Sequence, residues 1–140
     1  MNQPSAEDSR KKIMRSIIMT ANILRTDQEQ QILRVFQLQK NLPEVDTAAL
    51  EKYCAFLTKK LLFPIQGTFN QETGPLQHTT LPVIIKYLSE DIDKFYGIYA
   101  EGIVGKKHVE IPLADFDCNT TDHRNYQLID DFKTWFWNNR

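Results

Sequence analysis

The chain has 140 residues, of which 41% are hydrophobic and 25% are charged, and these are the proportions of a globular domain rather than of a disordered chain. Its formal net charge is −1, so it lacks the overall positive field that holds nucleic acid. The two cysteines have no CxxC spacing, and no run approaches the ~18 apolar residues of a membrane span, so we expect a cytoplasmic protein without a disulfide framework or a zinc site.

Two helices are expected before the first strong element. The first carries an apolar stripe at three-and-four spacing that ends at Leu24. Asp27 caps the second, weaker helix, which ends before Pro43. We interpret residues 1–45 as a helical extension. The apolar face of its first helix suggests a second hypothesis, in which the extension docks a protein partner or a second copy of the chain as a homo-oligomer.

The clearest predicted element is a helix that Asp46 or Thr47 caps and that ends before Pro64. Its apolar residues recur at i, i+3, i+4, i+7 and i+11, which is typical of a helix with one buried side. These residues are Leu50, Tyr53, Cys54, Leu57 and Leu61. Cys54 is therefore expected to be a buried thiol. This helix begins the second predicted region, a helix–sheet–helix module over residues 46–140.

After this helix the hydrophobic period changes from 3.6 to 2, which is typical of half-buried strands. Four strands are predicted, over residues 63–69, 81–87, 95–104 and 109–113. A turn-rich loop over 70–80 separates the first two strands, and Gly105-Lys106 turns the third strand into the fourth. The short connections favour an antiparallel meander.

A last helix is expected to begin near Thr121 or Asp122 and to reach almost to the end of the chain. Its aromatic residues fall on one side, as in a helix that covers a core, whereas Trp137 falls outside that stripe and should be exposed. The predicted fold is therefore α+β. It has N-terminal helices, a four-stranded antiparallel meander sheet or small SH3-like barrel, and a C-terminal helix.

The sequence contains no recognisable set of catalytic residues. The three histidines lie on separate loops or strand starts and lack metal-ligand spacing. No local Ser/His/Asp or Cys/His pairing is present, and neither the GxxxxGK[ST] nor the GxGxxG phosphate-binding pattern occurs. We therefore do not expect an enzyme.

Acidic residues of the second half gather in two segments. The first holds Glu90, Asp91 and Asp93, and the second holds Asp115, Asp117, Asn119 and Asp122. In a meander, the loop before the third strand and the segment after the fourth lie at the same end of the sheet, so the two segments should meet. Clustered carboxylates repel each other unless a cation lies among them, and calcium accepts six to eight oxygen ligands. The sequence thus predicts a calcium site, with Glu90, Asp91, Asp93, Asp115, Asp117 and Asn119 as candidate ligands.

The spacing Asp115-x-Asp117-x-Asn119 matches ligand positions 1, 3 and 5 of an EF-hand loop. Thr120 stands where that loop has its turn glycine, and Tyr126 stands where it has its closing glutamate. This segment is therefore not an EF-hand. The alternative interpretation is a solvated acidic rim with an aspartate cap for the last helix.

Four runs of the second region carry a resemblance to a known family. They are Tyr53-Cys-Ala-Phe-Leu-Thr-Lys-Lys-Leu-Leu-Phe-Pro64, the stretch from Val83 to Gly97 with its acidic interruption, Ile111-Pro-Leu-Ala-Asp115, and Asp131-Phe-Lys-Thr-Trp135. Together they resemble the cyanobacterial-type family of bacterial calcium-binding proteins, over roughly residues 50–137. The resemblance implies a non-EF-hand protein that binds calcium through acidic residues and acts as a calcium buffer or in calcium signalling.

Overall fold

The computed structural model describes residues 27–74 and 77–140. The first predicted helix lies outside these residues, so its role as a docking face stays a prediction. Residues 27–36 are helical, where the second helix was predicted. Within the described ranges, no helix combines the length and the apolar character needed to cross a membrane.

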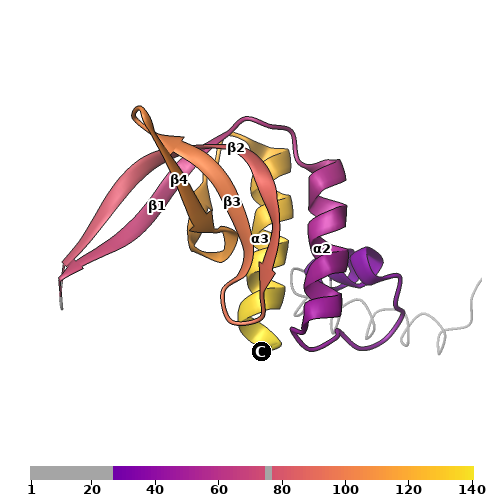
Figure 1. Ribbon diagram of the computed structural model, residues 1–140. Helices are drawn as coiled ribbons and strands as arrows, with labels where there is room; N and C mark the ends of the chain where they lie inside the picture. The colour runs from indigo at the N-terminus through magenta and orange to yellow at the C-terminus, as the bar shows by residue number, and fades with distance from the viewer. Residues whose placement is uncertain (1–26, 75–76) are drawn as a thin grey trace, which may run out of the picture.

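The described part of the chain forms helices and one five-stranded antiparallel sheet (Figure 1). After the 27–36 helix come α2 (Thr47–Lys60), β1 (Ile65–Gly74), β2 (Gln77–Asp93), β3 (Gly97–Val104), β4 (Lys107–Pro112), the 3-10 helix η1 (Leu113–Asp115), β5 (Phe116–Cys118) and α3 (His123–Asn138). The strand order is β4-β3-β2-β1-β5. The α+β prediction is confirmed, but the sheet is open rather than a closed barrel and contains a fifth strand.

Helix α2 begins and buries its side chains as its pattern predicted. The side chain of Asp46 accepts a hydrogen bond from the Ala49 N–H at 2.7 Å, which satisfies one of the free donors of the first turn. The apolar stripe is buried, and Cys54 is a buried free thiol, as expected.

The core lies between the sheet and the two helices α2 and α3, which stand beside each other on one side of it (Figure 1). Its centre is aromatic: the ring of Tyr53 lies 5.2 Å from that of Trp135 and 5.1 Å from that of Phe132, between centroids. Phe36 joins the same cluster, so the 27–36 helix shares the core of the rest. Trp137 is 52% exposed, which confirms its predicted position.

The buried side-chain amide of Asn125 connects the start of α3 to the chain between α2 and β1 through hydrogen bonds. The side-chain oxygen of Asn125 accepts the Leu62 N–H at 2.9 Å, and its side-chain nitrogen donates to the Leu62 carbonyl oxygen at 2.9 Å. Asp122 caps α3 and accepts a second hydrogen bond from the same nitrogen. A polar side chain inside the predicted apolar stripe therefore positions the helix.

Strands β1 and β2 continue well beyond the sheet body as a two-stranded arm (Figure 1). The prediction of a loop over residues 70–80 is wrong, because backbone pairing runs on through Asn70↔Thr80 to Glu72↔His78. The Thr80 hydroxyl donates to the Asn70 side-chain oxygen at 2.9 Å. Hydrophobic alternation cannot reveal such a ribbon, because backbone pairing between the two strands does not require it.

The fifth strand, β5, pairs with the outer edge of β1 through Gly67↔Cys118 and Phe69↔Phe116. Gly67 makes this approach possible, because a Cβ there would collide with the Asp117 carbonyl oxygen and the Phe116 ring. The 3-10 helix η1 carries the chain from β4, at one edge of the sheet, to β1 at the other. The sequence pattern did not predict this crossing.

Candidate functional site

From Asp117 onward, the second acidic segment does not meet the first as expected. Asp117 pairs with Thr68 in β1, and Thr68 pairs with Pro82, near the far end of β2 from Asp93. Asp93 instead pairs with Gly97 at the β2–β3 turn. The expectation was wrong because it treated the chain after β4 as staying at that end of the sheet, whereas β5 docks on the opposite edge.

In the second acidic segment, the side chains of Asp117 and Asn119 form hydrogen bonds with other residues of the chain. The Asp117 carboxylate accepts a hydrogen bond from Lys133 at 2.7 Å, and Lys133 also donates to the Phe116 carbonyl oxygen. The pKa of Asp115 is raised, mainly by partial burial, with Asp117 adding to the effect and Lys133 opposing it. The Asn119 side-chain oxygen accepts the Thr121 N–H and hydroxyl. The role of Asp115, Asp117 and Asn119 as calcium ligands stays a prediction.

The first segment lies at the end of β2, where the strand turns into β3. Glu90 and Asp91 are exposed. One carboxylate oxygen of Asp93 accepts the N–H groups of Phe95 and Tyr96, at 2.6 Å and 3.0 Å, so Asp93 also shapes the turn. The exposed Glu90 and Asp91 and the partly exposed Asp93 thus form an acidic edge.

A pair of glutamates that the sequence analysis missed lies next to this edge. The register of the β3–β4 hairpin places Glu101 directly opposite Glu110, with Tyr87 of β2 on the other side of Glu101. The pKa of Glu110 is raised, first by a hydrogen bond with the Glu101 side chain, then by slight desolvation and by the charges of Glu101 and Asp91. Glu101 and Glu110 thus face each other across β3 and β4, and the charge of Asp91 acts on Glu110.

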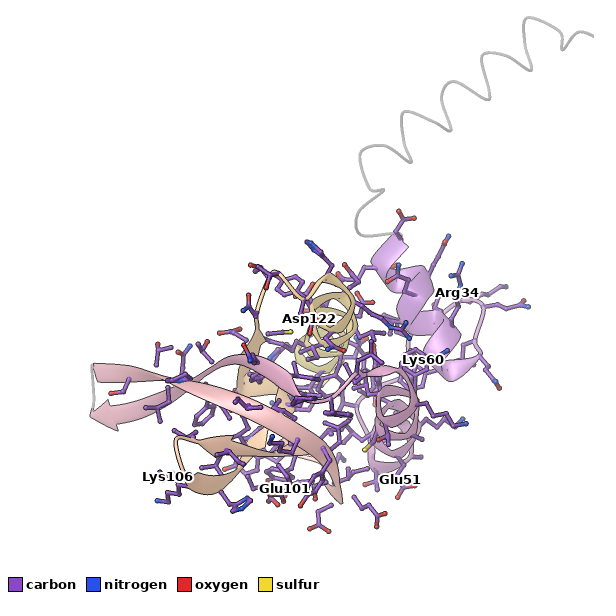
Figure 2. All side chains as sticks on the ribbon, turned by 90° about the horizontal axis from the view of Figure 1, so that it is seen from above. Arg34, Glu51, Lys60, Glu101, Lys106 and Asp122 are labelled. Carbon is purple, nitrogen blue, oxygen red and sulfur yellow. The ribbon has the colours of Figure 1, made fainter. Side chains whose placement is uncertain are left out.

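These carboxylates occupy the outward face of the sheet. Along β3, the residues on either side of Glu101 are the buried Ala100 and Gly102, so Glu101 points away from the core. In Figure 2, Glu101 and the Asp122 that begins α3 lie on opposite sides of the molecule. We call Asp91, Glu101 and Glu110 the acidic face.

The acidic face is not a closed coordination cage. Within residues 27–74 and 77–140, no group of three or more His, Cys, Asp or Glu side chains is arranged to hold a metal ion. A hard cation there would find two carboxylates in contact and a third nearby, and it would take its other ligands from water.

Comparisons with known proteins indicate a calcium-binding family. A sequence model of the CcbP-type family, described as calcium binding, matches residues 43–136, from before α2 into the last turns of α3. The crystal structure of Anabaena CcbP is similar, with a TM-score of 0.59 and 16% identity, over 82% of this chain and 91% of that one. A search of curated proteins found no match.

Proposed function

Because this chain belongs to the CcbP calcium-binding family, we propose that it binds calcium, and that the ion lies on the acidic face of β2, β3 and β4. One observation carries the position: the hairpin register sets Glu101 directly opposite Glu110. Like charges that face each other across two strands destabilise a sheet. A divalent cation between them removes that repulsion.

The chemistry of this face suits calcium better than a transition metal. Carboxylate oxygens are hard ligands, and calcium accepts them in flexible geometry together with water. Asp91 adds a third carboxylate, since its charge acts on Glu110. With so few protein ligands, we expect a dissociation constant of roughly 10⁻⁴–10⁻³ M. A site of this strength fills only at submillimolar to millimolar calcium, and the proposed role is binding rather than catalysis.

A calcium titration of variants followed by NMR tests this position. Glu101→Gln and Glu110→Gln should each weaken calcium binding about tenfold or more, because each removes one of the few charged ligands. Asp117→Asn serves as the matched control, since its carboxylate is already paired with Lys133. Its calcium affinity should stay within about twofold of the parent protein.

Two results would contradict the proposal. If calcium shifts no amide of β2, β3 or β4 at millimolar concentration, the chain does not bind calcium at this face. If Asp117→Asn abolishes binding while both glutamate variants retain it, the site lies beside β5 instead, as the sequence pattern suggested.

Calcium binding should weaken as the pH falls through the raised pKa of Glu110. A proton and the cation compete for the same carboxylate, so binding releases a proton in the pH range just above the ordinary Glu value of 4.5. Isothermal titration in two buffers of different ionisation enthalpy measures that release. In Glu110→Gln the release should disappear, and its persistence would assign the proton to another group.

The same pKa shift has a defined sign for stability without calcium. The folded state holds the Glu110 proton more tightly than the unfolded chain, because the pKa is raised on folding. The contribution of this group to stability is therefore present below the ordinary pKa and is lost as the pH rises through the raised value.

A further inference from the structure

A second candidate site lies among the helices, away from the acidic face. A partly open cavity of about 330 Å³ is lined by residues of the 27–36 helix, α2 and α3. Apolar side chains form its walls, namely Val35, Phe56 and Leu128. This volume is at the lower end of the range for ligand pockets, so the cavity suits a small molecule.

One of the residues that line the cavity has a buried hydroxyl group without a partner. Tyr53 lines it and is 1% exposed, and its hydroxyl oxygen is the one buried side-chain N or O atom in the described ranges that makes no hydrogen bond. Buried polar groups nearly always have a partner, so an orphaned one needs an explanation. Burial and the charge of Asp131 raise the pKa of Tyr53, so this hydroxyl keeps its proton and acts as a donor.

Asp131 of α3 also lines the cavity and is 5% exposed. One of its carboxylate oxygens accepts hydrogen bonds from the side-chain amides of Gln28 at 3.0 Å and Gln127 at 2.8 Å. These amides fix the carboxylate, whose charge acts on Tyr53. A donor and an acceptor are thus both present among the buried residues that line the cavity.

The exposed side of the cavity is positively charged. Arg34 from the 27–36 helix and Lys60 from the last turn of α2 both line it, and both are exposed. Figure 2 shows them beside each other on these two helices. Among the lining residues Asp131 is the one carboxylate, so an anion that enters meets two cations first.

We propose that this cavity binds a small organic anion with an apolar body and a hydroxyl group at its far end. Arg34 and Lys60 hold the anionic group, the apolar walls contact the body, and Tyr53 and Asp131 bond the hydroxyl as donor and acceptor. Carboxylate and phosphate compounds share this chemistry. The proposal does not depend on calcium.

Calcium-free titration of the full chain with 4-hydroxybenzoate tests the proposal, with NMR and tryptophan fluorescence as readouts. Trp135 reports on the cavity because its ring lies 5.2 Å from that of Tyr53. Benzoate lacks the hydroxyl and 4-hydroxybenzyl alcohol lacks the charge, so each should bind about tenfold more weakly than 4-hydroxybenzoate. The matching phosphate ester, 4-hydroxyphenyl phosphate, distinguishes a carboxylate site from a phosphate site.

Variants locate the binding. Tyr53→Phe removes only the orphaned hydroxyl, so it should retain the folded state while losing about tenfold in affinity for 4-hydroxybenzoate but not for benzoate. Lys60→Gln should weaken both acids, whereas Lys59→Gln, the neighbouring lysine outside the cavity, should weaken neither. The proposal is overturned if none of the acids shifts cavity residues at millimolar concentration, or if Tyr53→Phe binds 4-hydroxybenzoate as tightly as the parent protein.

Discussion

Replacing Asn125 with alanine is expected to lower the free energy of unfolding by about 2–4 kcal/mol. The amide is buried and satisfies both the N–H and the carbonyl oxygen of Leu62, and no other side chain of the described chain bonds these two groups. The variant leaves both backbone groups without their side-chain partner, and each such loss costs about 1–2 kcal/mol, the lower part of the usual range, because the two hydrogen bonds are only part-buried. Urea denaturation followed by circular dichroism measures the difference.

Asn119→Ala is the matched control for this prediction. Asn119 also accepts hydrogen bonds through its side chain, but they are local, exposed and made to Thr121. Its loss should cost under about 1 kcal/mol, because water replaces an exposed partner. Equal destabilisation by the two variants would show that the amide of Asn125 does not hold α3 against the chain after α2.

Gly67→Ala should destabilise the protein by about 1–3 kcal/mol, the usual cost of forcing extra volume into a packed contact. The added methyl group meets the Asp117 carbonyl oxygen and the Phe116 ring, and backbone cannot move aside as a flexible side chain can. We expect β5 to separate from β1. Amide hydrogen exchange should therefore rise at Asn119, whose N–H donates to the Gln66 carbonyl oxygen.

Gly105→Ala separates this collision from a simple loss of backbone freedom. Gly105 has a φ of 63° but open space around its Cβ position, so alanine meets only the strain of a left-handed conformation, about 1–2 kcal/mol. The exchange rate at Asn119 should not change. If Gly67→Ala leaves that rate unchanged as well, the close approach of β5 tolerates a side chain.

The helices were predictable because each has a local signal. Asp46 and Asp122 stand at N-caps, and the apolar stripes of α2 and α3 match their buried faces. The inner halves of β1 and β2 alternate as half-buried strands should. Residues 70–80 gave no such signal, since their sequence is mostly polar and rich in turn-forming residues, and backbone pairing does not require apolar alternation.

The acidic pattern of residues 115–119 also follows the burial pattern around the short strand β5. Phe116 and Cys118 are buried, and Asp115, Asp117 and Asn119, which alternate with them, are exposed. This is the period-2 pattern of a half-buried strand. The segment was too short to stand out, and the glycine that receives it, Gly67, lies in a different part of the sequence.

The position of Glu101 opposite Glu110 could have been predicted from the sequence. The turn at Gly105-Lys106 was predicted, and a two-residue turn pairs Val104 with Lys107, so Glu101 must face Glu110. The cavity between the helices could not have been predicted in this way. It depends on how the 27–36 helix docks against α2 and α3, and no local pattern specifies the neighbours of Tyr53 and Asp131.

The pairing of β5 with β1 also has a consequence for the order in which the chain assembles during synthesis. The outer edge of β1 stays without its partner until the ribosome has released the residues that follow β4, because β5 comes next to last among the elements. A nascent chain therefore exposes unpaired backbone beside Gly67, and such an edge invites pairing with other chains. Because β5 is short, its late synthesis delays pairing for only a few residues of β1.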